Sequence, residues 1–517
     1  MASSPYMIGV DIGTTSTKAV LFEENGTIVA QGGADYPLYT PTPAIAEQDA
    51  EDIFKAVVES VKQATSKAGI KPDEILFVSF SSAMHSILPV DEHGKPLMRA
   101  MTWADNRSTE WTEALKTEMN GHEIYLRTGT PIHPMSPLTK IMWLTRDQPE
   151  LFKQTHKFIS MKEYVFYKLF SEYVIDHSMA SATGMMNLEK LDWDEEALHV
   201  VAGITPDHLS RLVPTTHVLK KGLNPDYAKE MGIADSTPFV IGASDGVLSN
   251  LGVNAIDPGV VAVTIGTSGA IRTVVDKPVT DPKGRFFCYA LTEDAWVIGG
   301  PVNNGGVIFR WIRDELAASE VETAKRLGID PYEVLTRVAE NVPPGSEGLL
   351  FHPYMTGERA PLWNPNARGS FFGLTLHHKK EHMIRAALEG VLFNLYTVML
   401  AIEEKIGRPK KIQATGGFAR SELWRQMMAD IFDQDVIIPE SIESSCLGAA
   451  VLGLYALGRI DSLSAVSGMI GSTHRHQPDP DSVRVYRELL PIFIRISRKF
   501  EEEYADIAAF QNKTMQK

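Results

Sequence analysis

The sequence predicts an α/β protein built from two domains, and three observations lead to this fold class. The chain has 517 residues, more than one hydrophobic core usually supports, so we expect two domains of roughly 250 residues each. Strand and helix patterns alternate along the first half, as far as "TPFVIGASDG" at 237–246. The segment 254–275 then resembles a restart, with an apolar strand, a Gly-Thr-Ser-Gly turn and another strand. By itself, so short a repeat fits a coincidence as well as a duplication.

The chain begins with a predicted β-meander. Residues 8–12 and 17–22 form apolar strand patterns, and the Asn-Gly pair at 25–26 favours a tight turn before a third strand at 27–31. Apolar residues at helical spacing, and a final strand pattern, predict the elements that follow. These are a helix over 49–69 that ends at Gly69, a strand over 74–82, and later helices over 305–318, 379–406, 420–433 and 484–508.

Composition indicates an ordinary soluble globular protein, with 44% hydrophobic and 22% charged residues. The two cysteines, Cys288 and Cys446, lie far apart without metal-ligand spacing, so we expect core residues in a reducing compartment and no structural zinc site. The N-terminus lacks a signal-peptide pattern, and no run approaches the roughly 18 apolar residues that cross a bilayer. We therefore expect a cytoplasmic protein with no membrane partner.

The formal net charge of −15 disfavours a nucleic-acid partner, because binding to a phosphate backbone normally needs a clustered basic face. The Lys and Arg residues are instead scattered along the chain. A local basic site on an acidic protein still allows an anionic small molecule as ligand. The charge alone names no substrate.

A lone acid, Asp11, stands inside the first apolar strand, and "DIGTTSTK" continues with Gly13, the hydroxyl residues Thr14, Thr15 and Ser16, and Lys18. In one interpretation these residues cap a turn and satisfy local backbone groups. In the other they form a phosphate-binding hairpin, with N–H groups and hydroxyls for the phosphates and an acid for hydrated Mg²⁺. The sequence lacks the P-loop pattern. A second such turn, at 266–268, would provide a second phosphate loop.

These motifs together resemble the FGGY carbohydrate kinases, and the resemblance runs over nearly the whole chain. "DIGTTSTK" resembles the family's first phosphate loop, "GASDGVLSNLG" (242–252) its catalytic-acid segment, and "TIGTSGA" (264–270) its second phosphate loop. "ATGGFARSELWRQMMADIF" (414–432) resembles the adenosine-binding segment. "MSPLTKIMWL" (135–144) and "GSFFGLTLHHKKEHMIRAALE" (369–389) follow the two family signatures, the first with some departure after Leu144. Each motif alone is weak, but their common order is specific.

The resemblance implies two actin-like or ribonuclease-H-like ATPase domains that flank an interdomain cleft. The N-terminal domain would span 1–253 and hold the sugar site, the first phosphate loop and the catalytic Asp. The C-terminal domain would span 254–517, hold the nucleotide site and end in a helical extension. The implied activity is an ATP-dependent sugar kinase that uses Mg²⁺. A homodimer is compatible with the sequence, which does not otherwise reveal the oligomeric state.

The resemblance also assigns residues to the nucleotide and metal. Asp11 would hold Mg²⁺ through water, and Asp245 would be a second metal contact. Lys18 could equally be a solvated strand residue, and Gly416 with Gly417 could be only a strand-to-helix turn. Ser421 departs from the family, which often has Asn or Asp there. The nucleotide-binding set is Asp11, Gly13, Thr14, Thr15, Ser16, Lys18, Gly266, Thr267, Gly306, Gly417 and Ser421.

Asp245 matches the family's catalytic aspartate, which accepts the proton of the attacking alcohol as its oxygen meets the γ-phosphorus. It follows the apolar run "PFVIGAS", at a strand end where α/β folds place reactive groups. The alternative is a helix N-cap, because Asp before Gly-Val-Leu could cap the next helix.

Several stretches resemble the family members that act on a sugar acid: "SFSSAMHSI" (79–87), "TWADNRS" (102–108), "RTGTPIHPMSPL" (127–138) and "IGASDGVLSNLGVNAI" (241–256). They imply D-gluconate as substrate, phosphorylated on its terminal hydroxyl to 6-phospho-D-gluconate. The substrate-binding set is Met84, His85, Trp103, Asp105, Arg107, His133 and Asp245. Arg107 or His133 could supply the cation or N–H donor that the substrate carboxylate needs, although His133 could also simply pack beside its neighbouring prolines.

Two other functions compete with this interpretation. The first is a kinase of the same family with another polyol or ketose, such as xylulose, ribulose or glycerol. The second is a non-kinase actin-like module, either a chaperone ATPase or a sugar-responsive regulator. A regulator should carry a DNA-binding helical segment and a chaperone a peptide-binding domain, and we find neither pattern in the sequence.

Overall fold

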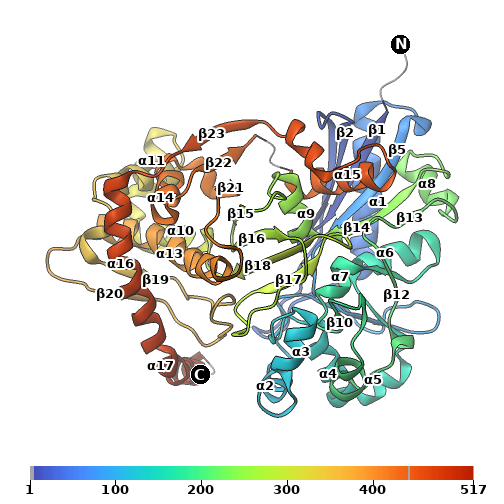
Figure 1. Ribbon diagram of the computed structural model, residues 1–517, viewed down its shortest axis with the longest axis horizontal. Helices are drawn as coiled ribbons and strands as arrows, with labels where there is room; N and C mark the ends of the chain where they lie inside the picture. Colours follow the sequence, from blue (N-terminus) through green and yellow to red (C-terminus); the bar gives the residue numbers. More distant parts are fainter. Residues whose placement is uncertain (1–4, 441–442, 516–517) are drawn as a thin grey trace. The chain divides into compact units, whose positions relative to one another are not determined.

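The structure is a computed structural model that describes residues 5–440 and 443–515 (Figure 1). It confirms the α/β class, and its contacts divide the chain into two units. Unit 1 comprises Met1–Asp257, Val274–Ile298 and Glu443–Gly471, and unit 2 comprises Pro258–Thr273, Gly299–Ile442 and Ser472–Lys517. The predicted domain boundary after residue 253 lies close to Asp257, where the first segment of unit 1 ends. Two later segments of the chain also belong to unit 1. Two continuous domains and a cleft between them stay predictions.

Unit 1 is built on a six-stranded sheet with the order β13-β14-β5-β1-β2-β3, and β1, β2 and β5 lie side by side in Figure 1. The predicted meander is confirmed, because β1 pairs antiparallel with β2 and β2 with β3. β5 runs parallel to β1, and β14 parallel to β5. The strands are β1 (Tyr6–Ile12), β2 (Ser16–Glu23), β3 (Ile28–Asp35), β5 (Ile75–Ser82), β13 (Val218–Leu219) and β14 (Phe239–Ser244).

Helices cover both faces of this sheet. On one face, α1 (Ala50–Ala68) packs over Ile8 and Val10; it begins at the N-cap Asp49 and ends at the left-handed Gly69, as predicted. On the other face, α15 (Ser444–Ala456) packs over Met7, since neighbouring residues of a strand point to opposite faces. Gly9 allows this close approach, because a Cβ there would lie 2.1 Å from the Cys446 carbonyl oxygen.

The remaining elements of unit 1 are shorter, and the loops between them carry all of the predicted sugar-site residues except Asp245, which begins α9. The helices are α2 (Thr109–Glu118), α3 (Gly121–Thr128), α4 (Pro137–Asp147), α5 (Pro149–Gln154), α6 (Met161–Phe170), α7 (His177–Ser181), α8 (Pro225–Met231) and α9 (Asp245–Gly252). The short strands are β4 (Glu47–Gln48), β6 (Leu88–Val90), β7 (Ala100–Met101), β8 (Lys157–Ile159), β9 (Val174–Asp176), β10 (Met186–Asn187), β11 (Asp192–Trp193) and β12 (Arg211–Val213). Short helical turns are η1 (Pro72–Glu74), η2 (Glu196–Ala202), η3 (Pro206–His208) and η7 (Leu463–Gly468).

A seven-stranded sheet has the order β17-β18-β16-β15-β21-β22-β23. Its strands β15, β21, β22 and β23 belong entirely to unit 2. β15 pairs antiparallel with β16 and parallel with β21, which runs parallel to β22. This repeats the arrangement of β2, β1, β5 and β14, so the geometry favours duplication over coincidence. The strands of this sheet are β15 (Val260–Ile265), β16 (Gly269–Val275), β17 (Phe287–Ala290), β18 (Trp296–Val302), β21 (Lys411–Thr415), β22 (Val436–Pro439) and β23 (Ser472–His476). A separate two-stranded sheet consists of β19 (Leu350–His352) and β20 (Ser370–Phe372).

The helices of unit 2 follow the predicted pattern with one correction. The single helix expected over 484–508 is two helices, because α16 ends at Lys499 and α17 begins at Glu501. Three acidic residues, 501–503, open α17, where negative charge favours a helix N-terminus. The elements are α10 (Gly306–Trp311), η4 (Ile312–Leu316), α11 (Ala318–Leu327), α12 (Pro331–Glu340), η5 (Ser346–Gly348), α13 (Lys380–Ile406), η6 (Gly417–Arg420), α14 (Glu422–Phe432), α16 (Pro480–Lys499) and α17 (Glu501–Met515).

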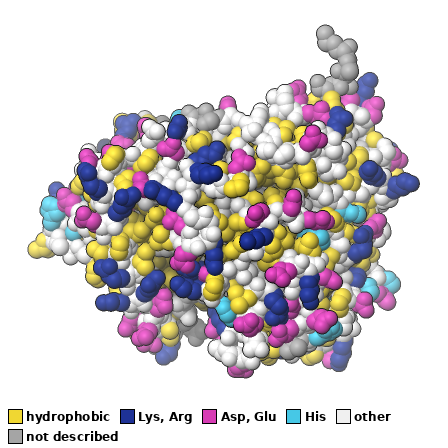
Figure 2. Space-filling model, in the orientation of Figure 1, with side chains coloured by type: hydrophobic (Ala, Val, Ile, Leu, Met, Phe, Trp, Pro, Cys, Tyr) yellow, Lys and Arg dark blue, Asp and Glu magenta, His cyan; other side chains and the backbone are white. Residues whose placement is uncertain are grey.

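Two sequence expectations concern membranes and nucleic acids. Among the described residues, α13 alone is long and apolar enough to cross a bilayer by length and composition. Polar residues, among them Glu389 and Asn394, interrupt it, so it is not the unbroken apolar run that the sequence was expected to lack. Of its most apolar window, 78% is buried inside the protein, as in a core helix. On the face shown in Figure 2, Lys and Arg side chains are interspersed with Asp and Glu, in agreement with the scattered charges of the sequence.

Candidate functional site

The first predicted phosphate loop is the turn between β1 and β2. The Gly13 N–H donates to the Ser16 carbonyl at 2.9 Å and closes the turn. The Tyr36 hydroxyl donates to the Gly13 carbonyl at 2.7 Å, and the Gln48 side chain donates to the Thr14 carbonyl at 2.6 Å. Thr15 is exposed at the tip. Two side chains from outside the loop, Tyr36 and Gln48, therefore hold its backbone by hydrogen bonds. The sequence did not reveal these two contacts, because both residues lie outside the loop motif.

Asp11 ends β1 beside this loop, and its Oδ1 accepts a hydrogen bond from the Ser81 hydroxyl at 2.7 Å. Burial, and next the negative charge of Asp245, raise the pKa of Asp11 to about 6. The two predicted metal residues therefore lie near enough for their charges to interact. A pair of carboxylates that repel each other fits a divalent cation, and Mg²⁺ prefers oxygen ligands of this kind.

Asp245 is the first residue of α9, directly after β14. The N-cap position belongs to Ser244, so the alternative that Asp245 is the N-cap was wrong by one residue. The Asp245 Oδ1 accepts a hydrogen bond from the Gly246 N–H at 2.7 Å. The Ser178 hydroxyl accepts from the Ser244 N–H at 3.1 Å, which fixes the strand end that presents the carboxylate.

Lys18 forms an ion pair with Glu443, at 3.0 Å between Nζ and Oε1. Partial burial lowers the pKa of Lys18, but the hydrogen bond and charge of Glu443 outweigh it, so the pKa lies above its ordinary value. Half of the Lys18 side chain stays exposed, so it is neither a purely solvated strand residue nor buried. Glu443 was not predicted as a partner of Lys18, because it lies 425 residues away in the sequence.

Predicted substrate residues lie beside the first loop. The Trp103 indole N–H donates to the Thr14 hydroxyl at 3.0 Å, and Gly13, Thr14, Met84 and Trp103 line one small cavity of about 10 Å³. The ring of His85 is fixed by its Nδ1, which lies 2.8 Å from the Ala182 carbonyl oxygen and therefore donates to it. The backbone of His85 has a φ of 70°, a left-handed conformation that is strained for a residue with a side chain.

Arg107 and His133 were the two candidates to bind a substrate carboxylate. The Arg107 guanidinium already binds Asp105 through Nε and Nη2 and contacts Glu47 at 2.8 Å, so two carboxylates share its charge. Asp105 is fully buried and also accepts from the Ala46 N–H, which makes it a support for Arg107. The His133 Nδ1 accepts from the Met135 N–H at 3.1 Å, so the Nε2 of the neutral ring carries a hydrogen and is a donor.

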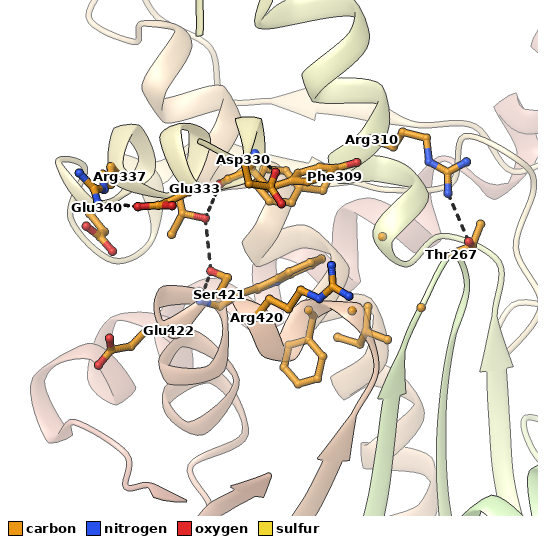
Figure 3. Close-up of a pocket in the computed structure, with 18 residues that line it drawn as sticks. Thr267, Phe309, Arg310, Asp330, Glu333, Arg337, Glu340, Arg420, Ser421 and Glu422 are labelled. Atoms are coloured by element: carbon orange, nitrogen blue, oxygen red, sulfur yellow. Dashed lines mark hydrogen bonds and ion pairs between the residues drawn. The ribbon is translucent and has the colours of Figure 1, made fainter. Parts of the chain in front are cut away.

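In unit 2, five predicted nucleotide residues line one pocket of about 620 Å³: Gly266, Thr267, Gly306, Gly417 and Ser421 (Figure 3). Aromatic rings form part of its wall. The ring centroid of Phe309 lies 5.0 Å from that of Tyr332 and 5.6 Å from that of Trp424. The lining carries the positive charges of Arg310, Arg337 and Arg420 and the negative charges of Asp330, Glu333, Glu340 and Glu422. An aromatic wall with nearby cations suits a base with attached phosphates.

The second phosphate loop is held by the start of α10. The N–H groups of Gly306 and Val307 donate to the carbonyls of Gly266 and Thr267 at 2.7 and 3.0 Å. Gly306 has no room for a side chain, because a Cβ there would lie 2.6 Å from the Gly266 carbonyl oxygen. Arg310 donates to the Thr267 hydroxyl at 3.3 Å (Figure 3). Arg310 was missed because nothing in its local sequence marks it.

Ser421 is the N-cap of α14, and its hydroxyl accepts from the Trp424 N–H at 3.1 Å. It also lies 3.4 Å from the Thr336 hydroxyl of α12 across the pocket (Figure 3). Gly417 begins the short turn η6 after β21, and a Cβ there would meet nothing within 4 Å. Both are therefore turn or cap residues that also face the pocket, so the two interpretations of this segment coexist.

Glu358, a fully buried carboxylate that sequence reasoning missed, supports the segment before α10. Its Oε1 accepts from the backbone N–H of Asn303 at 2.5 Å and of Arg359 at 2.9 Å. Its Oε2 accepts from the side-chain amides of Asn304 and Asn394 at 2.9 and 2.8 Å. Burial raises the pKa of Glu358, while these hydrogen bonds act in the opposite direction.

Within the described residues, Glu347, His377 and His382 also place potential metal-ligand atoms within 4.8 Å of one another. The His382 Nδ1, however, accepts from the Lys379 N–H, so Nε2 carries the hydrogen of the neutral ring and donates to Glu347. A metal needs a nitrogen without a proton. The cluster is therefore a hydrogen-bonded one, with His377 as a second partner of the same carboxylate.

Comparisons with known proteins agree with this geometry. Residues 6–252 match the N-terminal domain of the FGGY family of carbohydrate kinases, and residues 261–457 match its C-terminal domain. The chain is 65% identical to a gluconokinase of Bacillus subtilis and 63% identical to a gluconokinase of Bacillus licheniformis, each over 98% of both chains.

Solved structures give the same result. A gluconate kinase of Lactobacillus acidophilus is 38% identical, with a TM-score of 0.92 over 97% of this chain and 99% of the other. A xylulose kinase of the same organism is also 38% identical, with a TM-score of 0.92 over 97% of this chain and 100% of the other. These matches confirm the actin-like fold that the motifs predict. The chain belongs to the FGGY family of carbohydrate kinases.

Proposed function

We propose that the protein transfers the γ-phosphoryl group of ATP to the terminal hydroxyl of D-gluconate, giving 6-phospho-D-gluconate. The observation that carries the proposal is the 65% identity, over 98% of both chains, to a relative named gluconokinase. A relative named xylulose kinase is 27% identical. A xylulose kinase at 38% identity keeps a ketose acceptor as the second candidate.

We assign Asp245 as the base of the reaction. Its position at the end of β14 supports this role, because one carboxylate oxygen is engaged by the Gly246 N–H and the group is held at a rigid strand end. The carboxylate takes the proton from the terminal hydroxyl while the oxygen of that hydroxyl attacks the γ-phosphorus. The bond from the γ-phosphorus to the bridging oxygen breaks, and ADP leaves with the electron pair.

Mg²⁺ bound with the nucleotide would neutralise charge on the phosphate oxygens. Asp11 would hold it through water, with Asp245 as the second carboxylate, and the mutual repulsion of these groups supports the assignment. The hairpin of Gly13 to Ser16 and the ammonium of Lys18 would bind phosphate oxygens in unit 1. In unit 2 the pocket of Figure 3 would hold the adenosine, with Thr267 and Arg310 toward the phosphates.

Arg107 and His133 stay the two candidates to bind the substrate carboxylate. The charge of Arg107 is shared by two protein carboxylates, and the Nε2 of a neutral His133 ring carries a hydrogen, because its Nδ1 accepts from a backbone N–H. Met84, His85 and Trp103 would line the polyol chain. We also propose a cytoplasmic location, no nucleic-acid or membrane partner, and a homodimer, which light scattering would test.

A coupled assay tests the acceptor directly. D-gluconate, D-xylulose, D-ribulose and glycerol are compared at saturating ATP and Mg²⁺, with a chelator as control for the metal. Gluconate should give the highest kcat/KM. A higher value for xylulose or glycerol would refute gluconate as the substrate and leave the family assignment intact.

The Asp245→Asn variant tests the base. Asn keeps the size and one acceptor oxygen for the Gly246 N–H, so the protein should melt near the wild-type temperature and keep much of its gluconate affinity. Loss of a general base costs about 10²- to 10⁴-fold in rate, so kcat should fall by that factor. A folded variant with more than about a tenth of the wild-type kcat would refute the assignment, given that expected size.

A further inference from the structure

Lys140, in the second turn of α4, is fully buried. Its Nζ donates to three backbone carbonyls, at 3.0 Å to His85, 2.6 Å to Thr102 and 2.7 Å to Met135. A protonated lysine has three N–H donors, so these acceptors match its full capacity. Burying an ammonium is costly unless its hydrogen bonds are satisfied, so the site is built for this group.

The three carbonyls belong to three separate chain segments, and each segment carries proposed substrate residues. His85 is itself one and follows Met84, Thr102 immediately precedes Trp103, and Met135 lies two residues after His133. One buried nitrogen therefore fixes the backbone of three walls relative to one another. The ammonium stabilises the backbone of each wall, and it thereby also sets the positions of the three walls relative to one another.

The strain at His85 points the same way. Non-glycine residues with positive φ cost of order 1–3 kcal/mol and persist only where their surroundings hold them. His85 has a φ of 70°, and among the bonds that hold it, its carbonyl accepts from Lys140 and its Nδ1 donates to the Ala182 carbonyl. Loss of the Lys140 bond would let this backbone relax and would move the imidazole.

We propose that Lys140 is a positioning residue, which holds the three walls of the acceptor site in the arrangement that binds the sugar acid. The proposal rests on the proposed function, because it takes the acceptor site from there. It concerns a residue that touches no substrate and acts through His85, Trp103 and His133.

The test is Lys140→Met, which keeps the length of the side chain and removes all three donors. The KM for gluconate should rise by about tenfold or more and kcat should fall, since one lost buried hydrogen bond already costs about that much. The KM for ATP should rise less than the KM for gluconate, because the nucleotide pocket lies in unit 2 and the walls reach the first phosphate loop through the hydrogen bond from Trp103 to Thr14. Equal changes in both KM values, or none, would overturn the proposal.

Lys157→Met is the matched control. The Lys157 Nζ also donates to backbone carbonyls, at 2.7 Å to Asp207 and 2.9 Å to Leu209, but neither residue is a proposed substrate contact. This variant should lower the melting temperature without raising the KM for gluconate. If it raises that KM as much as Lys140→Met does, general destabilisation explains both and the proposal is wrong.

A double-mutant cycle separates positioning from stability. If Lys140 acts through His85, the combined variant Lys140→Met with His85→Ala should lose less kcat/KM for gluconate than the product of the single losses. Multiplicative losses would contradict a shared mechanism. Should Lys140→Met fail to fold, Lys140→Gln keeps an amide donor and should show the same selective rise in KM at smaller size.

The wild-type acceptor assay makes the two proposals distinguishable. If wild type prefers a ketose to gluconate, the substrate assignment fails, and the variants are then measured with the preferred acceptor. A selective rise in its KM would still support Lys140 as the positioning residue. An unchanged KM for the preferred acceptor, with a folded variant, would refute it.

Discussion

Lys140 in unit 1 and Glu358 in unit 2 are both fully buried ions, yet they organise their surroundings with opposite charge. Lys140 donates to three backbone carbonyls, whereas Glu358 accepts from two backbone N–H groups and two side-chain amides. The sugar-side segments turn three backbone carbonyls toward Lys140, whereas backbone N–H groups and side-chain amides both point to Glu358. The sign of each buried group therefore matches the hydrogen-bonding groups that surround it.

The two residues also differ in what they support. Lys140 fixes segments that carry proposed substrate residues, and Glu358 fixes Asn303 and Asn304 just before Gly306, whose N–H holds the second phosphate loop. Such ions add little net stability compared with apolar side chains, but removing one partner leaves the others buried and unpaired. Each variant should therefore affect one ligand and spare the other.

The largest effect is expected for Glu358→Leu. Four N–H groups lose their acceptor, so the free energy of unfolding should fall by about 3 kcal/mol or more. The KM for ATP should rise while the KM for gluconate stays near wild type, the reverse of Lys140→Met. Urea denaturation and steady-state kinetics measure both. Glu358→Gln, which keeps one acceptor oxygen, is the milder control. A rise in the KM for gluconate alone would contradict the contrast between Glu358 and Lys140.

Opposite pH dependence should sharpen the comparison. Burial lowers the pKa of Lys140 to about 7, with Asp105 opposing and Arg107 adding to the shift. Below about pH 7, folded Lys140 is the ammonium that donates to the three carbonyls. Between that value and its ordinary 10.5, the unfolded lysine holds a proton that folded Lys140 has lost. Raising the pH through this window should increase the free energy of unfolding of wild type relative to Lys140→Met.

For Glu358 the sign reverses, because burial raises its pKa above the ordinary 4.5. Just above pH 4.5 the folded carboxyl holds a proton that the unfolded one has lost. Raising the pH there should decrease the free energy of unfolding of wild type relative to Glu358→Gln. Denaturation curves of the three proteins across pH test both slopes, and slopes of equal sign would contradict the assignments.

The smallest effect is expected at the exposed pair of Lys18 and Glu443. Half of the Lys18 side chain is exposed, so solvent screens the pair, and Glu443→Gln should change the free energy of unfolding by less than about 1 kcal/mol. If Lys18 binds phosphate, the KM for ATP should change more than that for gluconate. A stability loss as large as that of Glu358→Leu would show that burial does not set the cost of removing a charge.

Much of the fold follows from local pattern. The meander, the helix that ends at Gly69 and the second strand-turn-strand unit were all predicted, because alternation, capping residues and Asn-Gly turns act over a few positions. The break between α16 and α17 was missed, because apolar spacing continues across it while three acidic residues restart the helix. The helix α13 was predicted over 379–406, and its most apolar window is buried as in a core helix.

The residues of the candidate site also fall into those that a short motif predicts and those that only the structure reveals. Gly13 and Gly266 could be found because each lies in a short motif, and the structure places both in closed turns. Glu358 could not, and Lys140 was found only as part of the signature 135–144, without its role, since a buried ion is recognised by partners that lie far away in the sequence. The predicted roles of Asp11 and Asp245 gain support from their electrostatic interaction, which no sequence spacing reveals.

The bond from the Trp103 indole to the Thr14 hydroxyl joins an acceptor wall to the phosphate loop. Any acceptor that shifts the indole then changes which hydrogen bonds Thr14 can offer a phosphate. Thermodynamic linkage makes the effect reciprocal, because the factor by which acceptor binding alters nucleotide affinity equals the factor in the other direction. A single hydrogen bond between two side chains thus provides heterotropic coupling between the two substrates of the enzyme.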